Sequence, residues 1–199
     1  VLVTGVQTCA LPISADAGRV MDQPENYTPD RRVTPHLVAL AGCVGQKLDE
    51  SSIATCWGGV VSGDGVDLSE IGTDGAMWWV RLANLTVAAP GGQANGTVSC
   101  KPVLLANVGV GYATCYPINE DGEALDPQQQ LKLSDLVHAA MMAMYRGMAC
   151  CTWHEGSVGI GQVTVVTWTP QGPQGGVLGG EWLLQFEIIG NRPEQDDAP

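Results

Sequence analysis

The residues best suited to metal chemistry lie together near position 150. They are Cys150, Cys151, His154 and Glu155, which offer sulfur, nitrogen and oxygen ligands. Structural zinc sites usually combine Cys-x-x-Cys pairs or spaced histidines, and two adjacent cysteines followed by one histidine match that pattern poorly. We therefore predict no metal site, and a small Cys/His metal-binding enzyme is kept as an alternative function.

Other motifs of enzymes and nucleotide-binding proteins are missing from the sequence. No Gly-Lys-Ser/Thr follows a glycine pair, and neither Gly-x-Ser-x-Gly nor His-Glu-x-x-His occurs. The stretch Gly109-Val110-Gly111 lacks the third glycine of a dinucleotide-binding turn. His36 and His138 fall in predicted helices, where surface or core positions are more usual than catalytic ones. We predict no catalytic residue and no cofactor.

The charge and hydropathy of the chain limit its partners. Only nine Lys and Arg residues occur, and the net charge of −12 opposes binding to phosphates. We expect no direct nucleic-acid ligand, although an acidic surface could help DNA slide through a conduit without sticking. No apolar run approaches the roughly 18 residues of a membrane span, so we expect no membrane partner.

The first residues of the chain resemble a translated sequencing adapter and not a natural protein segment. Residues 3–13 (VTGVQTCALPI) resemble the in-frame translation of a sequencing adapter, so residues 1–14 are interpreted as an adapter-derived artefact. Met21 is then the suspected natural start. Residues 15–33 are expected to form a flexible leader, residues 34–190 a single α+β domain and residues 191–199 a disordered acidic tail.

Cysteine pairing is left open by the sequence. Once Cys9 is assigned to the adapter-like stretch, the remaining cysteines are Cys43, Cys56, Cys100, Cys115, Cys150 and Cys151. An even number fits disulfides, but the spacing does not select a pairing. Buried free thiols and at least one structural disulfide are both retained as possibilities.

Two segments have the hydrophobic periodicity of helices. The first is expected at residues 35–49, with Thr34 as its N-cap, and the second at 127–148. Methionines on the second are interpreted as core packing against a sheet. The supporting apolar positions are Leu37, Leu40, Ala41, Val44 and Leu48, then Leu133, Leu136, Val137, Ala140, Met141, Met144 and Met148.

Strands are expected between and after the helices, where Gly, Asp and Asn punctuate runs rich in Val, Trp and Thr. The last two should form a hairpin. The predicted order gives an α+β fold, with a single mostly antiparallel sheet of four to five strands and two main helices packed on it. The expected strands are residues 54–61, 76–85, 97–115, 162–169 and 181–189.

Two stretches carry a family resemblance: WTPQGPQGGVLGGEW at residues 168–182 and MWWVRL at 77–82. They resemble neck and tail-completion proteins of long-tailed phages that infect actinobacteria. In that family a segment like GPQGGCxGGEW follows a Cys-containing helix and precedes the last strand, and here Val177 stands in place of the cysteine. The element order is similar to that of tail-terminator proteins, whose sheet and helices assemble into a six-fold, hexameric ring.

The resemblance implies a structural virion protein assembled in the host cytoplasm. Such a protein caps the head-proximal end of the tail tube and joins it to the head connector. Its implied partners are further copies of itself, the tail tube protein and a head-connector or neck protein, and no cofactor is implied. Another virion component, such as a head-closure or minor tail protein, is the alternative.

The glycine-rich segment between the last two strands is the candidate subunit interface. Glycine allows close approach of a neighbouring backbone, although a mobile solvent loop would have the same composition. Trp57, Trp78 and Trp79 are expected either to anchor a subunit contact or to pack in the core. The candidate interface residues are Gln171, Pro173, Gly175, Gly176, Gly179, Gly180 and Trp182.

Overall fold

The structure is a computed structural model that describes residues 32–63, 65–71, 75–88, 103–117, 125–154, 160–174 and 176–189. The adapter-like start, the leader up to residue 31 and the acidic tail lie outside these ranges. So do Cys100 and Glu155.

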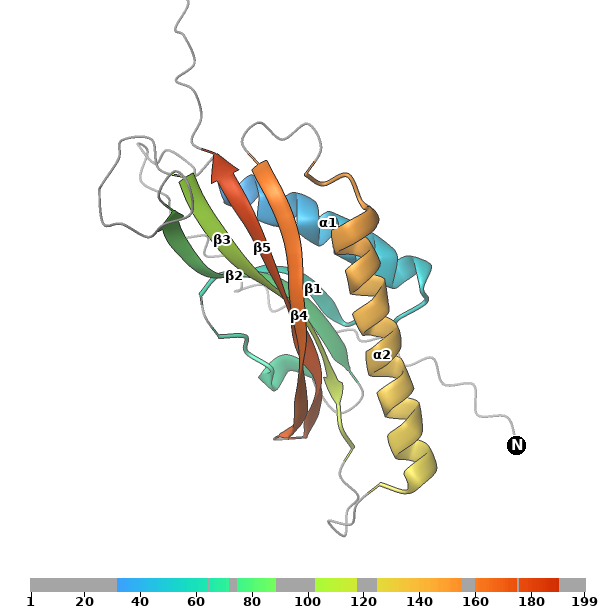
Figure 1. The fold of residues 1–199 in the computed structure, drawn as a ribbon. Helices are drawn as coiled ribbons and strands as arrows, with labels where there is room; N and C mark the ends of the chain where they lie inside the picture. Colours follow the sequence, from blue (N-terminus) through green and yellow to red (C-terminus); the bar gives the residue numbers. More distant parts are fainter. Residues whose placement is uncertain are drawn as a thin grey trace, which may run out of the picture.

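Five strands form one mixed sheet, and both α-helices pack on the same side of it (Figure 1). The strand order is β1-β2-β3-β5-β4; β1 runs parallel to β2, and all other pairs are antiparallel. The predicted α+β class and mostly antiparallel sheet are confirmed. The elements are α1 (Thr34–Glu50), β1 (Trp57–Val61), η1 (Ser69–Ile71), β2 (Ala76–Ala88), β3 (Val103–Cys115), α2 (Pro127–Cys150), β4 (Ile160–Gln174) and β5 (Val177–Ile189).

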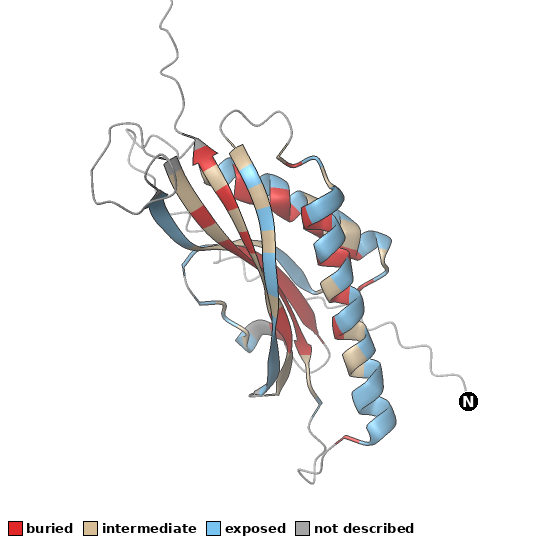
Figure 2. Cartoon of the chain, in the orientation of Figure 1, coloured by how far each residue is buried: buried red, intermediate tan, exposed pale blue. Residues whose placement is uncertain are grey.

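The main core lies between the helices and the sheet, because alternate residues of the central strands point toward the helices. Figure 2 shows buried residues concentrated on the inner faces of both helices and along the middle strands. Met144 and Met148 are buried there, which confirms that the methionines of α2 serve mainly in packing. The fully buried residues of this layer include Leu40, Val44, Val80, Val108, Val110, Met144, Leu184 and Phe186.

The starts of the two helices differ in their capping. Thr34 is the first residue of α1, so its prediction as N-cap is wrong; the preceding Val33 provides no side-chain cap. The Val33 carbonyl accepts from the backbone N–H groups of His36 and Leu37 at 3.0 and 3.2 Å, which begins the helix one residue earlier. At α2, the Asp126 carboxylate accepts from two backbone N–H groups in a capping box.

The β4–β5 hairpin is longer than predicted. Residues 170–180 were expected to connect the two strands, yet β4 continues to Gln174 and β5 begins at Val177. Val177 is already paired with Cys115 of β3, and Gly179 and Gly180 pair with residues of β3 on one side and of β4 on the other. The register shifts once in the β2–β3 pair, at the extra residue Ala83, and three times in the β4–β5 pair, where Val166 is one extra residue.

The sheet face opposite the helices is only partly covered. The connection from β1 to β2, which contains η1, crosses this face (Figure 1). It forms a second apolar cluster in which Ile71 packs with Met77, Trp79 and Ala113. None of the helices in the described ranges has the length and apolar character needed to cross a membrane.

Through Tyr112 of β3, the stability of the fold should depend on pH. Tyr112 is fully buried, and burial raises the pKa of its phenol to about 12, although the Thr114 side chain acts in the opposite direction. A tyrosine in the unfolded chain titrates near pH 10. The unfolded state therefore loses this proton first, and the stability of the fold should fall as the pH rises from about 10 to 12.

We expect urea titrations across this pH range to show a steeper loss of stability for the wild type than for Tyr112→Phe. The variant lacks the titrating hydroxyl but keeps the aromatic ring. Equal slopes for the two proteins above pH 10 would contradict the assignment.

Candidate subunit interface

The predicted interface residues occupy the end of the β4–β5 hairpin, in different environments. Gln171 and Pro173 are exposed, and Gly176 is half-buried in the turn with a φ of +79°. Gly175 lies outside the described residues. The backbone N–H of Tyr116 donates to the Gly176 carbonyl at 2.7 Å, so the turn is tied to the chain that leaves β3.

Gly179 and Gly180 are buried within the subunit. A Cβ atom at Gly180 would lie 2.3 Å from Cζ2 of Trp168, and one at Gly179 would lie 2.8 Å from the Cα of Ala113. Packing inside the chain therefore explains why both positions are glycine. Their contact with a second subunit stays a prediction.

Trp182 is half-buried in a strip of three aromatic rings, Tyr145, Trp182 and Trp168, which we call the aromatic strip. Its indole N–H donates to the Met141 carbonyl at 3.0 Å. Its ring centroid lies 5.6 Å from that of Tyr145 and 5.6 Å from that of Trp168. The strip thus joins α2 to β5 and to the edge strand β4.

Part of this surface is exposed. Tyr145 is 38% exposed, and Met142, one helical turn before it, is 47% exposed. Neither residue is predicted from the sequence, because both lie off the apolar face that predicted α2. Their type is the only sequence signal: a large apolar residue on the polar side of an amphipathic helix.

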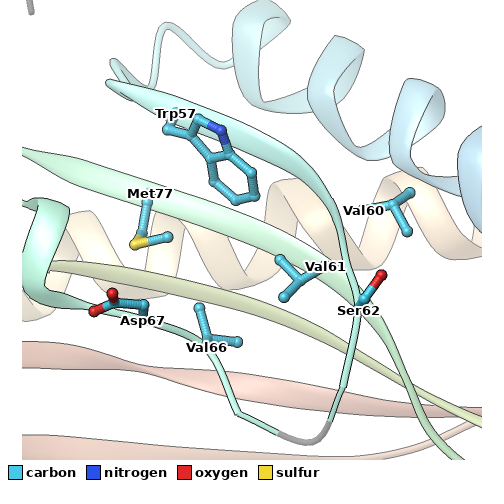
Figure 3. Close-up of a pocket in the computed structure, with 7 residues that line it drawn as sticks. All are labelled: Trp57, Val60, Val61, Ser62, Val66, Asp67 and Met77. Atoms are coloured by element: carbon cyan, nitrogen blue, oxygen red, sulfur yellow. The ribbon is translucent and has the colours of Figure 1, made fainter. Parts of the chain in front are cut away.

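A pocket of about 350 Å³ lies at the opposite edge of the sheet, beside β1 (Figure 3). Trp57 is 42% exposed at this edge, and Figure 3 shows Met77 between Trp57 and Asp67. Hydrogen bonds from the Ser69 hydroxyl and backbone N–H hold the pKa of the Asp67 carboxyl below its usual value. The residues that line this β1 pocket are Trp57, Val60, Val61, Ser62, Val66, Asp67 and Met77.

Comparisons with known proteins do not place the chain in a family. No protein-family model matches the sequence, and no curated protein is significantly similar to it.

Of the other predicted tryptophans, Trp78 and Trp79 are buried on opposite faces of β2. Gly111 leaves room for the Trp79 indole, because a Cβ atom at position 111 would lie 2.2 Å from the ring. The pair Gly109 and Gly111 therefore has a packing role in β3. Trp57 is the one of the three predicted tryptophans that lies at an exposed edge.

A charged bridge crosses the uncovered face from β2 to β5. The Arg81 guanidinium donates to both oxygens of Glu181, with Nε to Oε1 at 2.7 Å and Nη2 to Oε2 at 2.8 Å. Gly109 of β3 leaves room for this bridge to pass over the strand between them. Such a bidentate pair fixes the geometry of this face of the sheet.

The Cys/His group does not form a metal site in the described part of the chain. No three His, Cys, Asp or Glu side chains among those residues are placed to hold a metal ion. Cys150 is exposed, whereas Cys151 is half-buried against the main core. Three candidate surfaces for binding a partner remain: the hairpin end, the aromatic strip and the β1 pocket.

Proposed function

We propose that the protein is a structural virion component that closes into a ring, caps the phage tail tube and joins it to the head connector. One observation supports ring formation above all: two different apolar surfaces lie at opposite edges of the same sheet. The aromatic strip with Met142 is beside β4, and the β1 pocket is beside β1. Unlike surfaces that join head to tail produce a ring when the rotation between subunits closes.

The two surfaces have complementary characters. Tyr145 and Met142 present large apolar side chains, residue types that are enriched at the centres of interfaces. The β1 pocket is lined mainly by Val, Trp and Met side chains, with the carboxylate of Asp67 at its border. A neighbouring subunit that inserts Tyr145 or Met142 into this pocket would bury apolar area on both sides.

Continuous strand pairing between subunits is less favourable than side-chain contact. The strand β1 is short, from Trp57 to Val61. The edge strand β4 contains Pro170 and Pro173, which have no N–H to donate, and a bulge at Val166. These features protect both edges from adding a foreign strand.

The end of the hairpin is proposed to contact the tail tube or the head connector. Gln171 and Pro173 are exposed there on β4, which pairs with β5, and β5 is in turn paired with β3. The same segment carries the resemblance to tail-completion proteins. A fixed, protruding end suits recognition of an axial partner, because little loop entropy is lost on binding.

The ring interface can be tested with two complementary variants. Tyr145→Asp damages only the strip, and Trp57→Ala damages only the pocket. Each variant alone should need at least about tenfold more protein to assemble, measured by size-exclusion chromatography with light scattering. A mixture of the two should stop at dimers, since one intact strip meets one intact pocket. Val38→Asp is the control, because Val38 is 56% exposed on α1 and belongs to neither surface.

Binding to purified tail tubes tests the rest of the proposal. We expect the assembled protein to decorate one end of each tube in negative-stain images. A protein that stays monomeric at high concentration and does not bind tubes contradicts the proposal. Binding to the head connector without binding to the tube would instead indicate a head-closure protein.

A further inference from the structure

Two cysteines from distant parts of the chain meet where the helices cross. Cys43 lies in α1, and Cys151 directly follows α2. The Cys151 side chain is close enough to Cys43 to raise the pKa of the Cys43 thiol, and both side chains are half-buried against the main core. The two side chains are therefore neighbours, which is the first condition for a disulfide.

The crossing of the helices holds this pair together. At Gly147, an added Cβ would lie 2.9 Å from the Cα of Val44 and 3.1 Å from the Cys43 carbonyl oxygen, so the backbones touch at this point. Cys151 follows Gly147 by four residues, about one helical turn, which places it on the same side of α2. The close approach at Gly147 thus brings Cys151 to Cys43.

Trp153 fixes the chain after Cys151. Its indole N–H donates to the Met148 carbonyl at 3.0 Å, and its ring packs against Phe186 in the core at a centroid distance of 5.7 Å. Its backbone N–H also hydrogen-bonds to the Cys43 sulfur. The segment that carries Cys151 is therefore anchored on both sides of the thiol.

We propose that Cys43 and Cys151 form an intramolecular disulfide by exchange with a small-molecule disulfide such as oxidised glutathione. The Cys151 thiolate attacks one sulfur of the small disulfide, forms a mixed disulfide and releases one small thiolate. Cys43 loses its proton to solvent and attacks the Cys151 sulfur, which releases the second small thiolate. Two protein thiols are oxidised to one disulfide, and one small disulfide is reduced to two thiols.

The order of these steps follows from the environment of Cys43. Burial, together with the neighbouring Cys151, raises the pKa of its thiol to about 12 against the opposing effects of the Trp153 N–H and Lys47. A thiol that stays protonated at neutral pH is a poor first nucleophile, so Cys43 acts second. The bond would form with or without ring assembly, because both cysteines belong to one chain.

Peptide mapping of the full chain tests this pairing. Trypsin cuts after Arg32, Lys47 and Arg146, so the disulfide should link peptide 33–47 to the peptide that begins at Gly147. We expect this linkage after oxidised glutathione and its loss after reduction. The thermal midpoint should rise by about 5–10 °C, because the bond closes a loop of roughly 100 residues.

The adjacent cysteine supplies a matched control. Cys150→Ser should keep the linkage and the thermal shift, whereas Cys151→Ser and Cys43→Ala should lose both. No trypsin site separates Cys150 from Cys151, so tandem mass spectrometry of the linked wild-type peptide, with fragmentation between these two residues, decides the question even if a variant does not fold. Linkage of Cys43 to any other cysteine, dimers joined between chains, or no loss of thiols with oxidised glutathione would overturn the pairing.

Discussion

Replacing Phe186 with alanine is expected to lower the free energy of unfolding by about 3–5 kcal/mol. Phe186 is the only phenylalanine of the chain and is fully buried in β5, on the face that meets the helices. Its ring packs edge-on against His36 of α1 and Trp153 after α2, at centroid distances of 6.2 and 5.7 Å. One substitution therefore removes ring contacts from β5 to α1 and to the segment after α2.

Urea unfolding followed by circular dichroism measures this loss, and Leu183→Ala is the control. Leu183 is the half-buried residue of the same strand on the uncovered face, so its truncation should cost about 1 kcal/mol. A loss for Phe186→Ala no larger than that for Leu183→Ala would show that the ring is not at the centre of the core.

The second large effect is expected where the helices touch. Gly147→Leu should destabilise the fold by about 2–3 kcal/mol, because its Cβ would meet the backbone of α1 at Val44. The obstacle is main chain, which cannot move aside as the end of a long side chain could. One helix would have to shift against the other.

Gly42→Leu is the matched control, since it is another helical glycine changed to the same residue. A Cβ at Gly42 of α1 meets no atom within 4 Å, and the position is exposed. This variant should gain about 0.5–1 kcal/mol from helix propensity. Thermal unfolding of both variants should therefore move in opposite directions, and a shift of the same sign would contradict the close helix contact.

Periodicity predicted the fold well, because the pattern of burial follows from local geometry. The apolar spacing in α2 predicted the face that packs on the sheet. The segment after Trp168 was misjudged, since its glycines resemble a loop when their partners are unknown. Only the packing of Trp168 over Gly180 and the pairing with β3 show that these residues belong to strands.

The candidate surfaces were harder to predict, because they depend on which elements become neighbours. The hairpin end was predicted from its glycines and from the family resemblance. The β1 pocket combines β1, the connection after it and β2, and the aromatic strip combines α2, β5 and β4. No spacing in the sequence brings Tyr145 to Trp182 or Cys43 to Cys151. These contacts arise only from tertiary packing.

The β-bulges at Ala83 and Val166 have a consequence for assembly size. A sheet twists from strand to strand, and a bulge increases the local twist. Ala83 interrupts the register of β2 and Val166 that of β4, so both affect the twist between the two edges of the sheet. If subunits join edge to edge, the accumulated twist sets the angle between neighbours, and that angle sets how many subunits close a circle. Deleting either bulged residue is then a way to change the circumference of the assembly without altering its contacts.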